Sequence, residues 1–127
     1  MKYLKVAAPP IMMDRRRPVW GRPGRIRADA NARELDDLFL AWGCSLLVLD
    51  HAGDSIPDRL VGVAGLDCLV EYKAPKGRIR PGQAVFARFW RGRRDMARDR
   101  ADVMRIVGEL RALATRLGLD VPAAPGV

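Results

Sequence analysis

The sequence of 127 residues predicts one α/β domain, formed by a helix, three strands, a second helix, a fourth strand and a C-terminal helix. Two observations predict this class. Apolar residues recur at three- and four-residue spacing in three segments, as on the buried side of a helix. Between the first and second of these segments lie three short apolar runs bounded by turn residues, as in strands. The composition, 49% hydrophobic and 30% charged, is that of a globular chain.

The first helix is expected from about Ala30 to Trp42, because Gly43 is a suitable stop and apolar residues recur at helical spacing. Glu34 borders the apolar stripe, so its carboxylate can point inward at the edge of the core. Asp36 and Asp37 are expected on the outer side. The residues of the stripe are Leu35, Leu38, Phe39 and Trp42.

Three strands are expected after this helix. Residues 45–50 form a continuous apolar run, which is typical of a buried strand. The segments from Asp58 to Ala64 and from Asp67 to Lys73 then form an antiparallel hairpin, joined by a tight connection at Gly65-Leu66.

A second helix, a fourth strand and a last helix complete the domain. The second helix, over about residues 81–91, begins with a proline that suits a first helical turn. Residues 93–98 are expected to form a short strand despite their high charge. The last helix begins at Asp99 or Asp102 and stops at Gly118. The apolar residues of the two helices favour the core over a base-stacking role; they are Phe86, Phe89, Trp90, Val103, Ile106, Val107, Leu110, Leu113 and Leu117.

Charge is divided unevenly along the chain, whose net charge is +8. Residues 15–27 hold six arginines and no acid, and residues 73–100 hold ten basic and two acidic residues. Between them, residues 28–72 hold nine acidic and two basic residues. Basic blocks neutralise phosphates and clustered carboxylates bind divalent cations, so the pattern favours a polyanion-binding protein with a cation at its centre. A basic protein with solvated faces remains the alternative.

The ends of the chain differ from its middle. Residues 1–28 are expected to form a basic arm rich in proline and glycine, residues 29–118 the folded domain and residues 119–127 a loose tail. No apolar run could span a bilayer, and no signal peptide is expected, so no membrane partner is predicted. The basic blocks instead favour DNA as the partner. Cys44 and Cys68 are expected to be reduced core thiols in a cytoplasm.

The residues expected to contact DNA are Arg15, Arg16, Arg17, Arg22, Arg25, Arg27, Lys76, Arg78 and Arg80.

Three polar residues are expected to meet at one edge of the hairpin. Asp58 opens its first strand, and Glu71 and Lys73 close the second, where antiparallel pairing brings the two ends together. Because side chains alternate across a strand, Glu71 and Lys73 share one side and Tyr72 points away. Two carboxylates with the Tyr72 carbonyl can hold Mg²⁺ or Mn²⁺ against a phosphate, and Lys73 can orient or deprotonate water.

The motifs that carry this site resemble a known family. Residues 56–62 (IPDRLVG), residues 69–73 (LVEYK) and the following Gln83 are similar to the PD-(D/E)XK nuclease superfamily. Within it, residues 76–83 and Trp90-Arg91-Gly92 most resemble the virus-type replication-repair nuclease (VRR-NUC) domain. The resemblance implies a restriction-endonuclease-like αβββαβ core and Mg²⁺-dependent cleavage of DNA, often branched DNA such as Holliday junctions, by small proteins that often dimerise.

The resemblance also implies roles for individual residues. It assigns Asp58 and Glu71 as metal carboxylates, Lys73 as the catalytic lysine and Gln83 as the residue that helps to place water or phosphate. Glu34 would complete the metal site from the first helix. The expected setting is the cytoplasm of a bacterial or phage-infected cell. Two alternatives stay open: a non-catalytic DNA-binding module that keeps the fold, and the same nuclease chemistry in a restriction or mobile-element setting.

Overall fold

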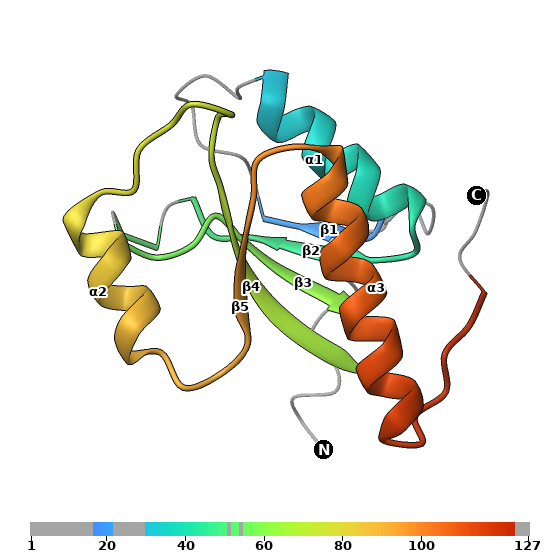
Figure 1. Ribbon diagram of the computed structural model, residues 1–127. Coiled ribbons are helices and arrows are strands. Elements are labelled where there is room, and N and C mark those ends of the chain that lie inside the picture. The colour runs from blue at the N-terminus through green and yellow to red at the C-terminus, as the bar shows by residue number, and fades with distance from the viewer. Residues whose placement is uncertain (1–16, 22–29, 51, 54, 124–127) are drawn as a thin grey trace, which may run out of the picture.

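The order of helices and strands confirms the predicted α/β class. The structure, a computed structural model, describes residues 17–21, 30–50, 52–53 and 55–123. After a short first strand, the elements follow the predicted αβββαβ order and end in a C-terminal helix (Figure 1). The elements are β1 (Val19–Trp20), α1 (Ala30–Ala41), β2 (Ser45–Val48), β3 (Arg59–Val63), β4 (Leu66–Tyr72), α2 (Pro81–Phe89), β5 (Arg94–Ala97) and α3 (Arg100–Arg116).

The strands form one mixed sheet in the order β1-β2-β3-β4-β5. Strands β2, β3 and β4 are antiparallel, whereas β1 pairs parallel to β2 and β5 pairs parallel to β4. The predicted charged strand therefore exists as β5. Its charge is tolerated because the Asp95 carboxylate accepts two hydrogen bonds of 2.9 Å from Arg105 on α3. Strand β1 was not predicted; two residues of the expected arm extend the sheet at its edge.

The hairpin of β3 and β4 turns one residue earlier than predicted, at Ala64-Gly65. Both residues have positive φ, 53° and 83°, as a two-residue hairpin turn with the twist of the strands requires. The resulting register places Arg59 opposite Val70 and Val61 opposite Cys68. Since side chains alternate, these four residues face one side of the sheet.

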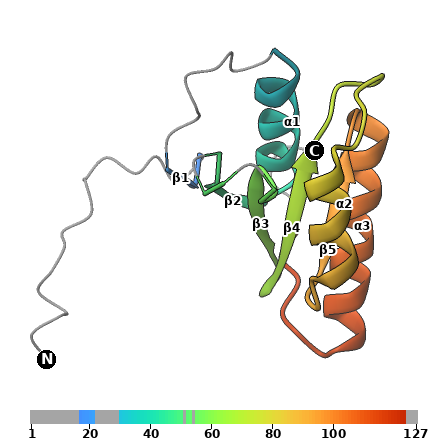
Figure 2. The same ribbon diagram turned by 90° about the vertical axis from the view of Figure 1, so that its left-hand side faces the viewer.

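Helices α1 and α3 lie side by side over that side of the sheet and enclose the core (Figures 1 and 2). The predicted stripes are largely confirmed, and both cysteines are buried free thiols. Leu117 is the exception: it is the C-cap of α3, lies beyond the last turn and is exposed. The largest buried apolar residues are Leu35, Phe39, Leu46, Val61, Val70, Val103, Ile106 and Val107.

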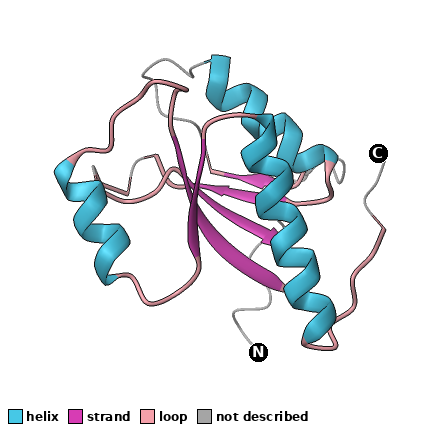
Figure 3. Cartoon of the chain, in the orientation of Figure 1, coloured by secondary structure: helices cyan, strands magenta, loops and turns pink. Residues whose placement is uncertain are grey.

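Helix α2 stands apart from α1 and α3, connected to the sheet by loops at both of its ends (Figure 3). Gln83 is its one buried residue. Phe89 and Trp90 are exposed, so their predicted place in the core is wrong. The reason is that α2 packs with one side only, and its other sides have no neighbouring element. Among the described residues, no helix has the length and apolar character needed to cross a membrane.

Candidate functional site

Two carboxyl groups meet where β3 begins and β4 ends. Asp58 immediately precedes β3, and its Oδ2 accepts a 2.8 Å hydrogen bond from the backbone N–H of Tyr72. The carboxyl group of Glu71, which is only 6% exposed, lies close enough to that of Asp58 for each group to shift the pKa of the other. The hairpin thus brings together the two residues that the sequence analysis expected to meet.

Gln83 joins this pair from α2. Its Nε2 donates a 2.5 Å hydrogen bond to Oε1 of Glu71, and its own Oε1 accepts a 3.0 Å bond from the backbone N–H of Arg80. One buried amide therefore connects the start of α2 to the end of β4. This contact holds the Glu71 carboxylate in one orientation.

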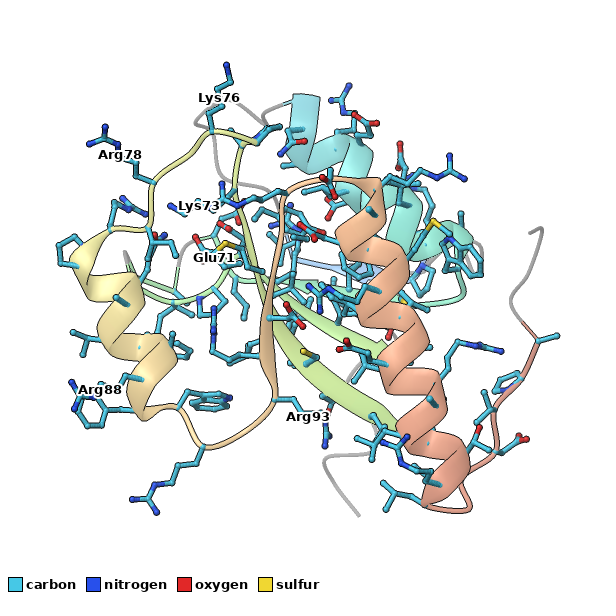
Figure 4. All side chains as sticks on the ribbon, in the orientation of Figure 1. Glu71, Lys73, Lys76, Arg78, Arg88 and Arg93 are labelled. Atoms are coloured by element: carbon cyan, nitrogen blue, oxygen red, sulfur yellow. The ribbon has the colours of Figure 1, made fainter. Side chains whose placement is uncertain are left out.

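Lys73 lies just beyond Tyr72, on the same side of the chain as Glu71 (Figure 4). Its positive charge acts on the Glu71 carboxyl and favours the ionised form. The backbone at Lys73 is held on both sides: its N–H donates to the Ala97 carbonyl at 3.1 Å, and its carbonyl accepts from Nδ2 of Asn31 at 3.1 Å. The amine is therefore carried by a fixed segment next to the carboxylates.

The two carboxyl groups cannot both ionise readily. Burial, followed by the nearby Asp58 carboxylate, raises the pKa of Glu71 from its ordinary value of 4.5 to about 7. Burial likewise raises the pKa of Asp58, and the Tyr72 N–H partly opposes this. The pair therefore retains a proton near neutral pH, and a cation placed between the groups would replace that proton.

We expect the metal-free protein to lose stability as the pH rises from 5 to 8. The folded chain keeps a proton on Glu71 that the unfolded chain releases near pH 4.5, so this contribution is complete below that value and is lost as the pH passes through about 7. The loss should be about 2–3 kcal/mol. Urea unfolding in EDTA measures it. Glu71→Gln should flatten this part of the profile, and an unchanged profile in that variant would contradict the assignment.

A buried charged cluster lies on the opposite side of the same strands. Asp36 accepts 2.9 and 3.0 Å bonds from Nε and Nη2 of Arg59 and a 2.7 Å bond from the Tyr72 hydroxyl. Arg59 is 2% exposed and also donates to Asp50 and to the Asp58 carbonyl. The expectation that Asp36 faces outward is therefore wrong. A helical pattern alone could not show that an arginine of β3 faces the core; Asp37 is exposed as predicted.

This cluster explains why Tyr72 stands between Glu71 and Lys73. Its side chain points away from them, as predicted, and its ring lies 5.0 Å below the Arg59 guanidinium and parallel to Phe39. Its backbone N–H meanwhile binds Asp58. The buried cluster and the carboxyl pair are thus built from adjacent residues of the same two strands.

The predicted DNA-contacting loop is exposed. Lys76 and Arg78 project into solvent above the site (Figure 4). The loop is held from below by Arg98, whose Nη1 donates to the carbonyls of Ala74 at 2.8 Å, Pro75 at 3.3 Å and Gly77 at 2.9 Å. Lys76 and Arg78 therefore extend from a loop whose backbone is held in place by Arg98.

The arm is described only in part. Arg17 forms a 2.9 Å ion pair with exposed Asp37 on α1. The remaining arginines expected to contact DNA lie outside the described residues; they are Arg15, Arg16, Arg22, Arg25 and Arg27.

Glu34 does not join the carboxyl pair. It is exposed on α1, whereas Asn31, one turn earlier, contacts the Lys73 carbonyl and Asp36 contacts the Tyr72 hydroxyl. Over the described part of the chain, no three acidic, histidine or cysteine side chains are grouped as metal ligands. The protein groups that could hold a cation are therefore the carboxylates of Asp58 and Glu71 and the carbonyl oxygen of Tyr72. Two carboxylates are a usual number for Mg²⁺, which keeps several waters and binds substrate phosphate.

A hollow of about 530 Å³ is lined by Glu71 of this pair. Glu71 and Gln83 line one end of it, and Phe86, Met96 and Arg94 line the part between α2 and β5. The Glu71 carboxyl group is therefore reachable from the side that faces α2. Comparisons of the chain with protein families, with curated proteins and with solved structures found no match.

Proposed function

We propose that the chain is a Mg²⁺-dependent endodeoxyribonuclease whose site consists of Asp58, Glu71 and Lys73, supported by Gln83. The observation that carries the proposal is the meeting of the Asp58 and Glu71 carboxyl groups at the ends of β3 and β4, with the Lys73 amine beside them. Glu71 is buried and Asp58 half-buried, and together they retain a proton near neutral pH. Such a pair of carboxyl groups is a weak structural contact and a suitable cation site. Mn²⁺ would serve as a substitute.

Each residue of the site would have a separate task. Asp58 and Glu71, with the Tyr72 carbonyl, would hold the cation, and Gln83 keeps Glu71 oriented toward it. A bound Mg²⁺ supplies neutralisation of phosphate charge and activation of water. Lys73 would orient the attacking water as an ammonium group, or take its proton as a neutral amine. The water oxygen would bond to phosphorus while the P–O bond to one sugar oxygen breaks, and that sugar oxygen would take up a proton from solvent water.

The charges around the site support DNA as the substrate. Residues 73–94 contain eight basic residues and no acidic residue. Lys76 and Arg78 stand on the loop that Arg98 holds, beside the carboxyl pair. Such cations would neutralise phosphates and position the strand without reading its sequence.

The resemblance to the VRR-NUC domain of the PD-(D/E)XK superfamily extends this proposal. It favours branched DNA, such as a Holliday junction or a flap, as the substrate and a homodimer as the active form. Glu34 would complete the site only if DNA or metal binding brought it to the pair. The setting that suits this activity is replication or repair in the cytoplasm of a bacterial or phage-infected cell.

The test is cleavage of plasmid, flapped and four-way-junction DNA in Mg²⁺ and in EDTA. We expect cutting in Mg²⁺ alone, and we expect Asp58→Asn to abolish it while DNA binding in EDTA persists. Asp67→Asn is the matched control, because Asp67 is an exposed residue near the turn of the same hairpin, at the end away from the carboxyl pair. DNA binding with no cutting on any substrate would instead indicate the non-catalytic DNA-binding module. Sequence-specific cutting of plain duplex would indicate a restriction or mobile-element role.

A further inference from the structure

The C-terminal half of α2 carries large apolar side chains that nothing in the described fold covers. Phe89 is 68% exposed, Val85 57% and Trp90 46%. Arg88 and Arg91 flank them on the surface. We refer to Val85, Arg88, Phe89, Trp90 and Arg91 as the α2 aromatic patch.

The aromatic rings of the patch are held in place by neighbouring residues. The Arg88 guanidinium lies over the Phe89 ring, 5.5 Å from its centroid, and Arg88 points outward from α2 (Figure 4). The Trp90 ring is stacked on Phe86 at 5.4 Å with an angle of 14° between the planes. The patch therefore offers flat apolar faces with guanidinium groups beside them.

From these observations we propose that the α2 aromatic patch stacks unpaired bases of a DNA strand, so that the enzyme recognises a single-stranded segment next to its cut. Exposed aromatic rings stack with any base, and adjacent arginines neutralise the phosphates. This inference rests on the proposed nuclease function, because it takes the strand cut at Glu71 and Lys73 to continue along α2.

Charge decides between DNA and a second copy of the chain as the occupant. A symmetric contact between two copies would bring Arg88 and Arg91 of one copy near the same arginines of the other. No acidic residue occurs from residue 73 to residue 94 to offset that repulsion. A phosphate backbone has the complementary charge.

The distance between Gln83 and the patch predicts where the stacked bases lie relative to the bond that is cut. Gln83, which binds Glu71, precedes Phe89 by six residues, or about 9 Å along a helix. Bases follow one another by about 3.4 Å in a stacked strand. The stacked bases should therefore lie two or three nucleotides from the bond that is cut.

The test measures binding in EDTA of three DNAs of equal length: a single strand, a flapped duplex and a plain duplex. The variants are Phe89→Ala, Trp90→Ala and the pair together. We expect each single variant to weaken binding of the single strand and the flap by about 10-fold and the pair by up to about 100-fold. Duplex binding should stay within about 2-fold. Phe89→Tyr should bind as tightly as the unaltered chain, and Leu117→Ala, which removes a comparably exposed side chain at the C-cap of α3, should have no effect.

A 2-aminopurine base placed two or three nucleotides from the cut in the flap supplies a second readout. Its fluorescence should fall on binding to the unaltered chain and to Phe89→Tyr, and not on binding to the double alanine variant. Equal losses on single-stranded and duplex DNA would overturn the inference. The inference would also be overturned if sedimentation showed that the double alanine substitution dissociates a dimer of the chain. It would likewise be overturned if vesicle assays showed that the patch binds anionic lipid.

The two proposals can fail separately. If the chain cuts DNA in Mg²⁺ and the patch variants bind flaps normally, the inference fails and the nuclease stands. If the chain cuts no DNA but the patch variants lose single-strand binding, the nuclease fails and the stacking surface stands as part of a binding module.

Discussion

Replacing Lys73 with alanine is expected to slow DNA cleavage by about 10²- to 10⁴-fold when DNA and Mg²⁺ are saturating. Lys73 is the amine beside the pair of Asp58 and Glu71 (Figure 4), and its backbone is fixed by Asn31 and Ala97. Its loss removes the group that would orient or deprotonate water but leaves both carboxylates in place. Single-turnover cleavage of a flapped duplex measures this rate directly.

Lys76→Ala is the matched control for this prediction. Lys76 is exposed on the loop three residues further on and has no expected contact with the reacting water. Its removal should weaken DNA binding and reduce its salt dependence without lowering the rate at saturating DNA. If purified Lys73→Ala cut at the unaltered rate, the assigned mechanism would be wrong.

Replacing Arg59 with methionine is expected to destabilise the fold by about 3–5 kcal/mol. Arg59 is 2% exposed and donates two hydrogen bonds to buried Asp36. Without it, Asp36 would remain a buried carboxylate with the Tyr72 hydroxyl as its main partner. The Asp58 carbonyl and Asp50 would also lose a donor. Urea unfolding at pH 8, where carboxyl groups are ionised, measures the cost.

Two further variants separate the buried charge from the loss of packing. In Asp36→Leu/Arg59→Met the unpaired carboxylate is absent, so the double variant should be more stable than Arg59→Met alone. Arg105→Met breaks the exposed ion pair with Asp95 and should cost less than about 1 kcal/mol. If Arg59→Met and Arg105→Met lowered the free energy of unfolding equally, the buried ion pair would stabilise the fold no more than the exposed one.

The identity of the site pair could be predicted because it depends on local rules. Asp58 and Glu71 stand at opposite ends of two runs that alternate and are joined by a short turn. A hairpin has one plausible register when one side is apolar, so the meeting of these residues follows from the pattern. The same rule placed Tyr72 on the opposite side, where its hydroxyl contacts Asp36.

The roles of acidic residues on α1 could not be predicted in the same way. From a helical pattern alone, an aspartate is predicted to face solvent, because burying a charge without a partner is costly. The partner of Asp36 is an arginine 23 residues away, whose orientation is decided by the strand register. Glu34, which the resemblance assigned to the metal site, is exposed, and Asn31 contacts the Lys73 carbonyl just beyond β4 instead.

By itself, the sequence determined the α/β class, the order of its elements, the hairpin and the meeting of Asp58 with Glu71, because periodicity and turn chemistry act over short distances. Only the tertiary structure decided the rest. It paired β1 with β2, turned Asp36 inward to Arg59 and brought Gln83 to Glu71. It also left the aromatic end of α2 uncovered. These outcomes depend on which distant surfaces pack together, and an amphipathic pattern specifies that a surface is apolar without specifying what covers it.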